Sequence, residues 1–523
     1  MKKIIIPTTK KLYARFLLSY STVIISFFVL YFQMDVNANN LQTGVPTVAV
    51  GPSTISFTIQ WDNSWYIAAG ASNWDGVWVF VKRQACTDNL WSHALVSTTA
   101  TDHSITGGVL QVDAVTDGMG VFIRRIGAGI GNIASATVTL KLQTAPNLVD
   151  NFQVFGIEMV NIPQGDFYIG DGTRGSSTYG FSDGLTCAVG PWNPKLITTA
   201  IQTAGMGLAA NYQCNSWGST VALPAAFPLG WNKFYCMKYE ISQEQYSSFL
   251  NVLTYDQQTG RTGNAPNSAV GTLAIAGATP SRNRIEIQTP GTINNIPAVY
   301  GCDLNNNGTY NEAADGQNLA CNWLSWPDLI AYLDWAAIRP MTEFEFEKVC
   351  RGTASVTANE NAWGSVTLLQ AESGALNNAG QVSETSTAAG AGLCAYGIAD
   401  LAKGPLRCGF AATGTTTRVQ AGSSYYGVMD MSGNVDEQCV GGYAYNYSAF
   451  TTANGDGSIS SVGSANIAGC PGVGGGQFGG VSRGSDWYTA NVLYPNVSDR
   501  YQMVLNYNQS RDYRVGGRGV RNW

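Results

Sequence analysis

Four residues in one short stretch carry the oxygen atoms that a hard metal ion needs. Asp430 and Glu437 supply carboxylates, and Gly433 and Val435 lie between them with backbone carbonyl groups. A turn at residues 432–434 would fold these groups around one cation, and Ca²⁺ takes about six to eight oxygen ligands in proteins. The spacing therefore predicts a structural calcium site, with a turn that carries solvated acids as the alternative.

A second stretch is a weaker calcium candidate. Asp303, Asn305 and Asn307 place oxygen-bearing side chains at alternate positions before Gly308, as at the start of a calcium-binding loop. The twelfth position of such a loop holds Ala314 in place of glutamate. The sequence leaves both a calcium site and a plain turn rich in Asn and Gly open here.

The composition excludes some classes of partner. The chain has 523 residues, of which 12% are charged, with 60 glycines and a net charge of −6. No stretch gathers the lysines and arginines that a nucleic-acid surface needs. This length favours two or more domains, and the composition is typical of a secreted protein rich in loops and strands.

The N-terminus predicts export. Lysines and an arginine precede the apolar run 16–32, and small residues follow at 36–38, so residues 1–38 are interpreted as a signal peptide. The alternative is an uncleaved membrane anchor, for which the apolar run is short. Cleavage would leave a protein secreted or held in the cell envelope, without stable membrane insertion. Eleven cysteines then leave at least one that is not in an intramolecular disulfide.

The order of elements predicts an α+β protein with two domains. Alternating apolar residues at 55–61, followed by apolar runs at 77–81, 121–126 and 138–142, favour an N-terminal β-sandwich over residues 44–144. The second domain covers residues 152–523, in which 170–230 is interpreted as an insertion of surface loops. Helices are expected to begin near Ser242, Ser325 and Thr342, each at a capping pattern.

The second region resembles a known family. Residues 425–437 resemble the Y-G-L-x-D-M-x-G-N-V-W-E signature of the formylglycine-generating, or sulfatase-modifying-factor, family. Further blocks agree in the same order, at 159–167, 234–250, 339–347, 483–487 and 516–521. The resemblance implies an irregular fold related to C-type lectins. It also implies calcium ligation by the side chains of Asp430 and Glu437 and the backbone of Gly433 and Val435, although Asp436 stands where the family usually has an aromatic residue.

The family's reactive site is missing from this chain. The resemblance places the copper-binding C-x4-C pair of the family's oxidases at Thr489 and Tyr494, and no cysteine follows Cys470. Iron-dependent relatives use histidines, and none follows His103. Neither copper nor iron is therefore expected, and a protein without catalytic activity is favoured. The alternative is an oxidoreductase of the formylglycine-generating type that acts on a protein cysteine.

The C-terminal segment has the composition of a recognition surface. Tyrosine, tryptophan and arginine are the residues that such surfaces favour. The candidate ligand-binding residues are Trp487, Tyr488, Tyr494, Arg500, Tyr501, Tyr507, Arg511 and Tyr513. The alternative is that the aromatic rings fill the core. The expected partner is a glycan, a peptide or a cell-surface protein.

Other charged residues are expected to have structural roles. Arg518 and Arg521 are expected to pair with buried acids. Glu343, Glu345 and Glu347 are expected at a solvated helix start, where the helix dipole favours them. A further alternative for the whole protein is a structural part of a cell-envelope assembly, because related domains resemble components of bacterial secretion and gliding machinery.

Overall fold

The computed structural model describes residues 40–87, 90–174, 180–181, 192–208, 222–371, 376–400, 402–441, 447–473, 479–501 and 510–523. The predicted signal peptide, Cys187, Cys214 and Tyr507 lie outside these residues. Within them, no helix has the length and apolar character needed to cross a membrane.

The N-terminal strands begin with a five-stranded antiparallel sheet. Its long central strands are β3 (Thr54–Tyr66) and β9 (Gly129–Lys141). β1 (Gln42–Thr43) and β2 (Thr47–Ala49) pair with β3, and β6 (Ser104–Ile105) pairs with β9. Ile55, Phe57, Ile59 and Trp61 of β3 are buried on one face, as the alternation of apolar residues predicts.

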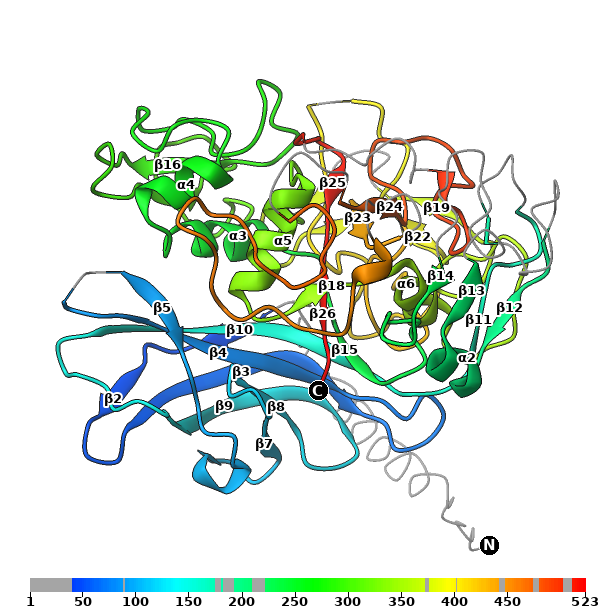
Figure 1. Cartoon of the computed structure of the whole chain (residues 1–523). Coiled ribbons are helices and arrows are strands. Elements are labelled where there is room, and N and C mark those ends of the chain that lie inside the picture. Colours follow the sequence, from blue (N-terminus) through cyan, green and yellow to red (C-terminus); the bar gives the residue numbers. More distant parts are fainter. Residues whose placement is uncertain are drawn as a thin grey trace, which may run out of the picture. The chain divides into compact units, whose positions relative to one another are not determined.

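An eight-stranded sheet joins the two regions that the sequence separates. It contains, in spatial order, β18 (Arg339–Pro340), β26 (Gly519–Arg521), β15 (Phe234–Met237), β10 (Asn151–Ile162), β4 (Asp75–Gln84), β8 (Val121–Arg125) and β7 (Leu110–Ala114), with β5 (Trp91–Ala94) also on β4. β4 and β10 pair from Asn151↔Gln84 to Val160↔Asp75. Hydrogen bonding between strands therefore crosses the boundary near residue 150 (Figure 1).

β4 is buried on both faces. Val77, Val79 and Val81 pack with the five-stranded sheet in one core. Trp78 and Phe80 point the opposite way and belong to a second core, shared with the helices of the C-terminal region. This explains why β4 reads as a continuous apolar run, since a strand covered on both faces has no polar side.

The three expected helices are confirmed. α3 (Gln243–Leu250), α5 (Trp326–Trp335) and α6 (Glu343–Arg351) start after Ser242, Ser325 and Thr342, and each has a complete capping box. Two short helices were not predicted, α2 (Thr199–Ala204) and α4 (Tyr255–Arg261). α4 has the same kind of capping box, at Thr254. This helix was not predicted because it is short and mostly polar.

Short strand pairs and loops make up most of the remaining described chain. The pairs are β11 (Phe167–Ile169) with β12 (Lys195–Ile197), β13 (Met206–Leu208) with β14 (Ala222–Leu223), β16 (Ile285–Thr289) with β17 (Val299–Cys302), β19 (Leu369–Gln370) with β22 (Leu393–Cys394), and β20 (Leu376–Asn377) with β21 (Thr385–Ser386). β23 (Asp436–Cys439) lies between β24 (Val481–Arg483) and β25 (Val515–Gly516). Sheet with few helices makes the protein α+β, as expected.

The interpretation of residues 170–230 as surface loops is wrong for the described parts. Strands β12 to β14 and helix α2 lie in this range. Phe181, Ile197, Phe227 and Leu229 are buried in the core that contains Trp78. In the described parts of this range, apolar residues therefore fill the core, which composition alone did not distinguish from a loop-rich surface.

A buried Lys–His contact lies where the N-terminal strands meet the C-terminal region. Lys82 Nζ donates to the carbonyls of Trp335, at 2.7 Å, and Gly457, at 2.5 Å. His93 Nε2 donates to the Met119 carbonyl at 2.6 Å, so its Nδ1 accepts from Lys82 Nζ at 3.2 Å. Burial, together with the charges of Lys82 and Arg521, lowers the pKa of His93 to about 3.

The neutral His93 should make the protein sensitive to acid. The folded chain keeps His93 unprotonated, whereas the unfolded chain protonates it below about pH 6.5, so the free energy of unfolding falls as the pH decreases from 6.5. We expect this residue to account for a loss of about 2 kcal/mol between pH 7 and pH 5. Urea unfolding of the parent and of His93→Gln at both pH values measures it. An identical pH dependence in the two proteins would contradict the assignment.

Candidate functional site

The three glutamates of α6 form a buried ion-pair network. Arg483 contacts Glu343 at 3.2 Å and Glu347 at 2.9 Å, and Arg500 holds Glu343 in a two-point contact at 2.7 and 2.8 Å. Arg339 binds both oxygens of Glu345 in the same way, at 2.7 and 2.9 Å. The expectation of solvated acids is therefore wrong, because these carboxylates are buried and each is balanced by arginine.

The predicted calcium residues lie in one buried loop that leads into β23. Asp430 has a φ of +58°, and its Oδ2 accepts from the Gly409 amide at 2.5 Å. Glu437 Oε1 lies 2.6 Å from Arg518 Nη2. A third acid joins them, since the carboxylate of Glu240 accepts from Asn434 Nδ2 at 2.9 Å and from the Val435 amide at 3.3 Å.

The loop has one feature of a cation site and one feature that opposes it. Oε1 of the buried Glu437 side chain faces Arg518, whereas Oε2 has no hydrogen-bond donor among the residues that the structure describes. Burial raises the pKa of Glu437 to about 7 against the opposing charge of Arg518. Burial and the charge of Asp430 also raise the pKa of Glu240. Within the described part of the chain, Oε2 of Glu437 is thus available as a ligand atom, while the guanidinium of Arg518 already supplies one positive charge nearby.

The expected pairing with a buried acid is confirmed for Arg518 and is wrong for Arg521. Arg518 is buried against Glu437 and also donates to the Met429 carbonyl at 2.8 Å. Arg521 contacts Asp117 at 2.5 Å, but the Asp117 side chain is 38% exposed, so the acid in this pair is not buried.

The loop at Asp303 closes with its own hydrogen bonds. Oδ1 of Asp303 accepts from the Asn307 amide at 3.0 Å, and Oδ2 accepts from the Gly308 amide at 2.9 Å. Asn305 Oδ1 also accepts from the Asn307 amide. Across the described residues, no cluster of three or more His, Cys, Asp or Glu side chains has metal-binding geometry.

The two positions aligned with the family's cysteine pair hold other contacts. The Thr489 hydroxyl and amide both donate to the Asp486 carboxylate, at 2.7 and 2.8 Å. The ring of Tyr494 stacks on Tyr501, with the ring centroids 4.9 Å apart. None of the nine cysteines that the structure describes is in a disulfide.

The predicted ligand-binding face is only partly on the surface. Trp487 and Arg500 are buried, Trp487 donating to the Tyr513 carbonyl and Arg500 pairing with Glu343, so their assignment to the face is wrong. Arg511 is half-buried in a contact with Asp328 at 2.8 Å. Half-buried rings remain at Tyr488, Tyr494, Tyr501 and Tyr513. Sequence alone did not separate rings that pack inward from rings that reach solvent.

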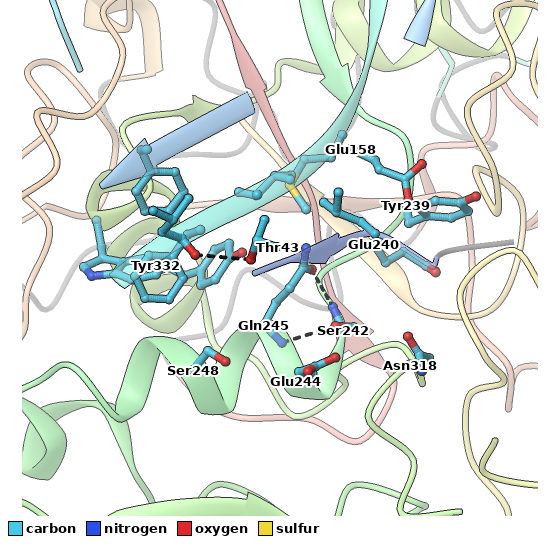
Figure 2. A pocket seen from close by; sticks show the side chains of 18 residues that line it. Thr43, Glu158, Tyr239, Glu240, Ser242, Glu244, Gln245, Ser248, Asn318 and Tyr332 are labelled. Atoms are coloured by element: carbon cyan, nitrogen blue, oxygen red, sulfur yellow. Dashed lines mark hydrogen bonds between the residues drawn. The ribbon is translucent and has the colours of Figure 1, made fainter. Parts of the chain in front are cut away.

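Two cavities were not predicted. One, of about 230 Å³, lies between β1, β10 and the start of α3 (Figure 2). The other, of about 360 Å³, lies between residues 63–73 and 412–429 and is lined by Trp65, Tyr425 and several threonines. No sequence motif marked either cavity, because each is built from segments far apart in the chain.

Comparison with known proteins identifies one family. No curated protein matches the chain. A solved structure described as "pH-induced modulation of Streptococcus parasanguinis adhesion by Fap1 fimbriae" is 14% identical, covers 32% of this chain and 84% of its own, and has a TM-score of 0.13, too low to carry an argument. The family model described as sulfatase-modifying factor enzyme 1-like domain matches residues 151–523, the range that begins with β10. With the network around α6 and the loop at 430–437 inside that range, the chain belongs to the sulfatase-modifying-factor family.

Proposed function

We propose that this protein is an exported, non-catalytic member of the sulfatase-modifying-factor family that binds a ligand. The observation that carries the proposal is the pair Thr489 and Tyr494 at the positions aligned with the family's reactive cysteines. Thr489 is held by Asp486, and the ring of Tyr494 lies on Tyr501. A hydroxyl and a phenol lack the soft sulfur that copper(I) selects.

The thiols elsewhere in the described chain are poorly suited to replace that pair. Burial raises the pKa of all eight buried cysteines above the usual value, so their thiolate forms are disfavoured. The ninth, Cys86, is exposed and precedes the family domain. These environments support a role other than thiol oxidation.

The proposed binding face is the part of the C-terminal segment that reaches the surface. Tyr494 and Tyr501 form a half-buried stacked pair, and Val492 and Leu493 beside them in sequence are 55% and 43% exposed. Rigid aromatic rings with neighbouring apolar groups suit recognition of another molecule. The proposed partner is a glycan, a peptide or a cell-surface protein.

The proposal includes a calcium ion in the loop at Asp430, Gly433, Val435 and Glu437. The free Oε2 of Glu437 supports it, and such an ion would neutralise acids that burial now makes costly. It also includes a β-sandwich for residues 44–144 and a C-type-lectin relation for the family domain. The core that the five-stranded sheet shares with β4, β7 and β8 of the eight-stranded sheet supports the first of these.

Two other functions belong to different classes. An oxidoreductase of the formylglycine-generating type would act on a protein cysteine through a site unlike the family's. A structural component of a cell-envelope assembly would use the same exposed face for a permanent contact. Copper binding would favour the oxidoreductase over a ligand-binding protein. Recovery of a stable complex from envelope extracts would favour the structural component.

The tyrosine face can be tested by substitution. Replacing Tyr494 and Tyr501 with alanine should weaken binding to a glycan or peptide array at least about tenfold, because stacked rings supply much of the energy at such surfaces. The melting temperature should change little, since both rings are half-buried. Tyr168→Ala, at an exposed tyrosine on β11, is the matched control. Collapse of stability, or equal loss in the control, would contradict the face.

Copper titration tests the absence of oxidase activity. With a cysteine peptide derived from a sulfatase, the parent protein should take up no stoichiometric copper(I) and form no formylglycine, because Thr489 and Tyr494 offer no thiolate. The variant with cysteine at both positions is the comparison. Copper uptake with peptide oxidation by the parent protein would overturn the non-catalytic proposal.

The number of bound calcium ions tests the proposed site directly. Glu437→Gln should reduce bound calcium by about one ion per chain, measured by elemental analysis, because it removes a carboxylate ligand. Calcium should then raise the melting temperature of the parent but not of the variant. Glu345→Gln, which breaks a buried pair with Arg339 outside the loop, should destabilise the protein equally with calcium and with chelator. Equal metal content in Glu437→Gln and the parent would rule the site out.

A further inference from the structure

The loop at residues 303–315, which follows β17, has a buried acid that its sequence pattern did not indicate. The twelfth position of the loop is Ala314, where a calcium-binding loop normally has glutamate. The next residue, Asp315, is fully buried. The Glu312 amide donates to Asp315 Oδ2 at 2.8 Å, and the Asp315 amide donates to the Glu312 carbonyl at 3.1 Å. This tight turn buries the carboxylate of Asp315, whereas Glu312 stays exposed.

One carboxylate oxygen of Asp315 lacks a donor. Its Oδ1 is buried and has no hydrogen-bond partner among the described residues. Burial and the charges of Asp303 and Glu312 raise the pKa of Asp315, whereas the backbone amides of Glu312 and Asn305 lower it. The influence of Asp303 and of the Asn305 amide places this carboxylate beside the first half of the loop. A buried acceptor without a donor is costly, so this oxygen favours a ligand that contacts it.

The hydrogen bonds that close the loop leave its oxygens able to bind a cation. Asp303 accepts from two backbone amides, one at each oxygen, and Asn305 Oδ1 accepts from the Asn307 amide. Asn307 Oδ1 accepts from the Thr309 amide at 2.7 Å. Each oxygen has two lone pairs, so one accepted hydrogen bond does not exhaust it. Because residues 305–309 are exposed above the buried Asp303, an ion can reach this position from solvent.

The loop also carries more negative charge than its neighbours balance. Glu286 of β16 is a fourth acid near Asp303, Glu312 and Asp315. Burial, with the charges of Asp303 and Asp315, raises the pKa of Glu286 to about 7, although Arg284 pairs with it at 2.6 Å. Of these four acids, only Glu286 forms an ion pair within the described part of the chain. A divalent cation would compensate the remaining charge, because opposite charges attract strongly where little water separates them.

We propose that this loop binds one Ca²⁺ ion, with carboxylate ligands from Asp303 and Asp315 and amide oxygens from the side chains of Asn305 and Asn307. A backbone carbonyl and water would complete the six to eight oxygens that Ca²⁺ takes. No three acids form a metal cluster among the described residues, and this ligand set needs only two. Mg²⁺ is disfavoured, because it demands a near-octahedral site and keeps several of its waters. The site does not depend on the function proposed for the tyrosine face.

Amide hydrogen exchange of the full chain, with calcium and with chelator, tests the proposal, because it reports on each loop separately. Calcium at about 100 times its Kd should slow exchange in residues 303–315 by up to about a hundredfold, since binding stabilises the closed loop. Asp315→Asn should raise the calcium concentration needed for this protection at least about tenfold, a loss that even a residue behind a metal ligand causes. Asp256→Asn, at an exposed acid in the first turn of α4, is the matched control and should respond as the parent does.

A second variant keeps the test decisive if Asp315→Asn unfolds the protein. Asn305→Ala changes an exposed side chain, so its melting temperature in chelator should equal that of the parent. It should also need at least about tenfold more calcium for protection of the loop. Calcium responses that are equal in the parent and in the folded variants would overturn the proposal, as would equal protection by magnesium. Protection confined to residues 430–437 would support the site proposed there and overturn this one.

Discussion

The antiparallel pairing of β4 with β10 is the constraint on which the rest of the structure depends. It joins the N-terminal strands of the eight-stranded sheet to β10, the first strand of the family domain, over the whole length of β4. Because β4 is covered on both faces, the side chains at 77, 79 and 81 fill one core and those at 78 and 80 fill another. Moving the register by one residue would exchange the two sets and place Lys82 in the wrong core.

The chain's end is tied to the same sheet. β26 pairs with β15 and β18, and β15 pairs with β10, so residues from 151 to 521 meet within one hydrogen-bonded surface. β15 pairs with β10 only from Met159 to Ile162, and Thr43 of β1 reaches the earlier part of β10 at the Val154 carbonyl.

Ion pairs between arginine and glutamate position the irregular parts of the family domain. Arg483 is the last residue of β24, whereas Arg500 and Arg518 lie outside helices and strands, and each of the three is fixed by a buried acid from α6 or β23. A guanidinium that grips both oxygens of a carboxylate fixes distance and orientation together. Such pairs add little net stability, because burying the two charges costs nearly what their attraction returns, but leaving one partner alone is costly. They therefore act mainly to hold the loops in one arrangement.

The sequence alone determined the features that depend on neighbouring residues. Ser242, Ser325 and Thr342 marked three helix starts, because a capping box needs only residues three apart. Alternating apolar residues marked β3, and the ordered blocks led to the family. The tertiary structure decided the features that depend on distant residues: which face each aromatic side chain uses, and whether an acid meets water or arginine. Glu343 is buried where it pairs with Arg483, 140 residues later in the chain. Trp487 is buried where it bonds to the Tyr513 carbonyl, 26 residues later. No local pattern encodes that contact, since burial is set by which segments the sheet brings together.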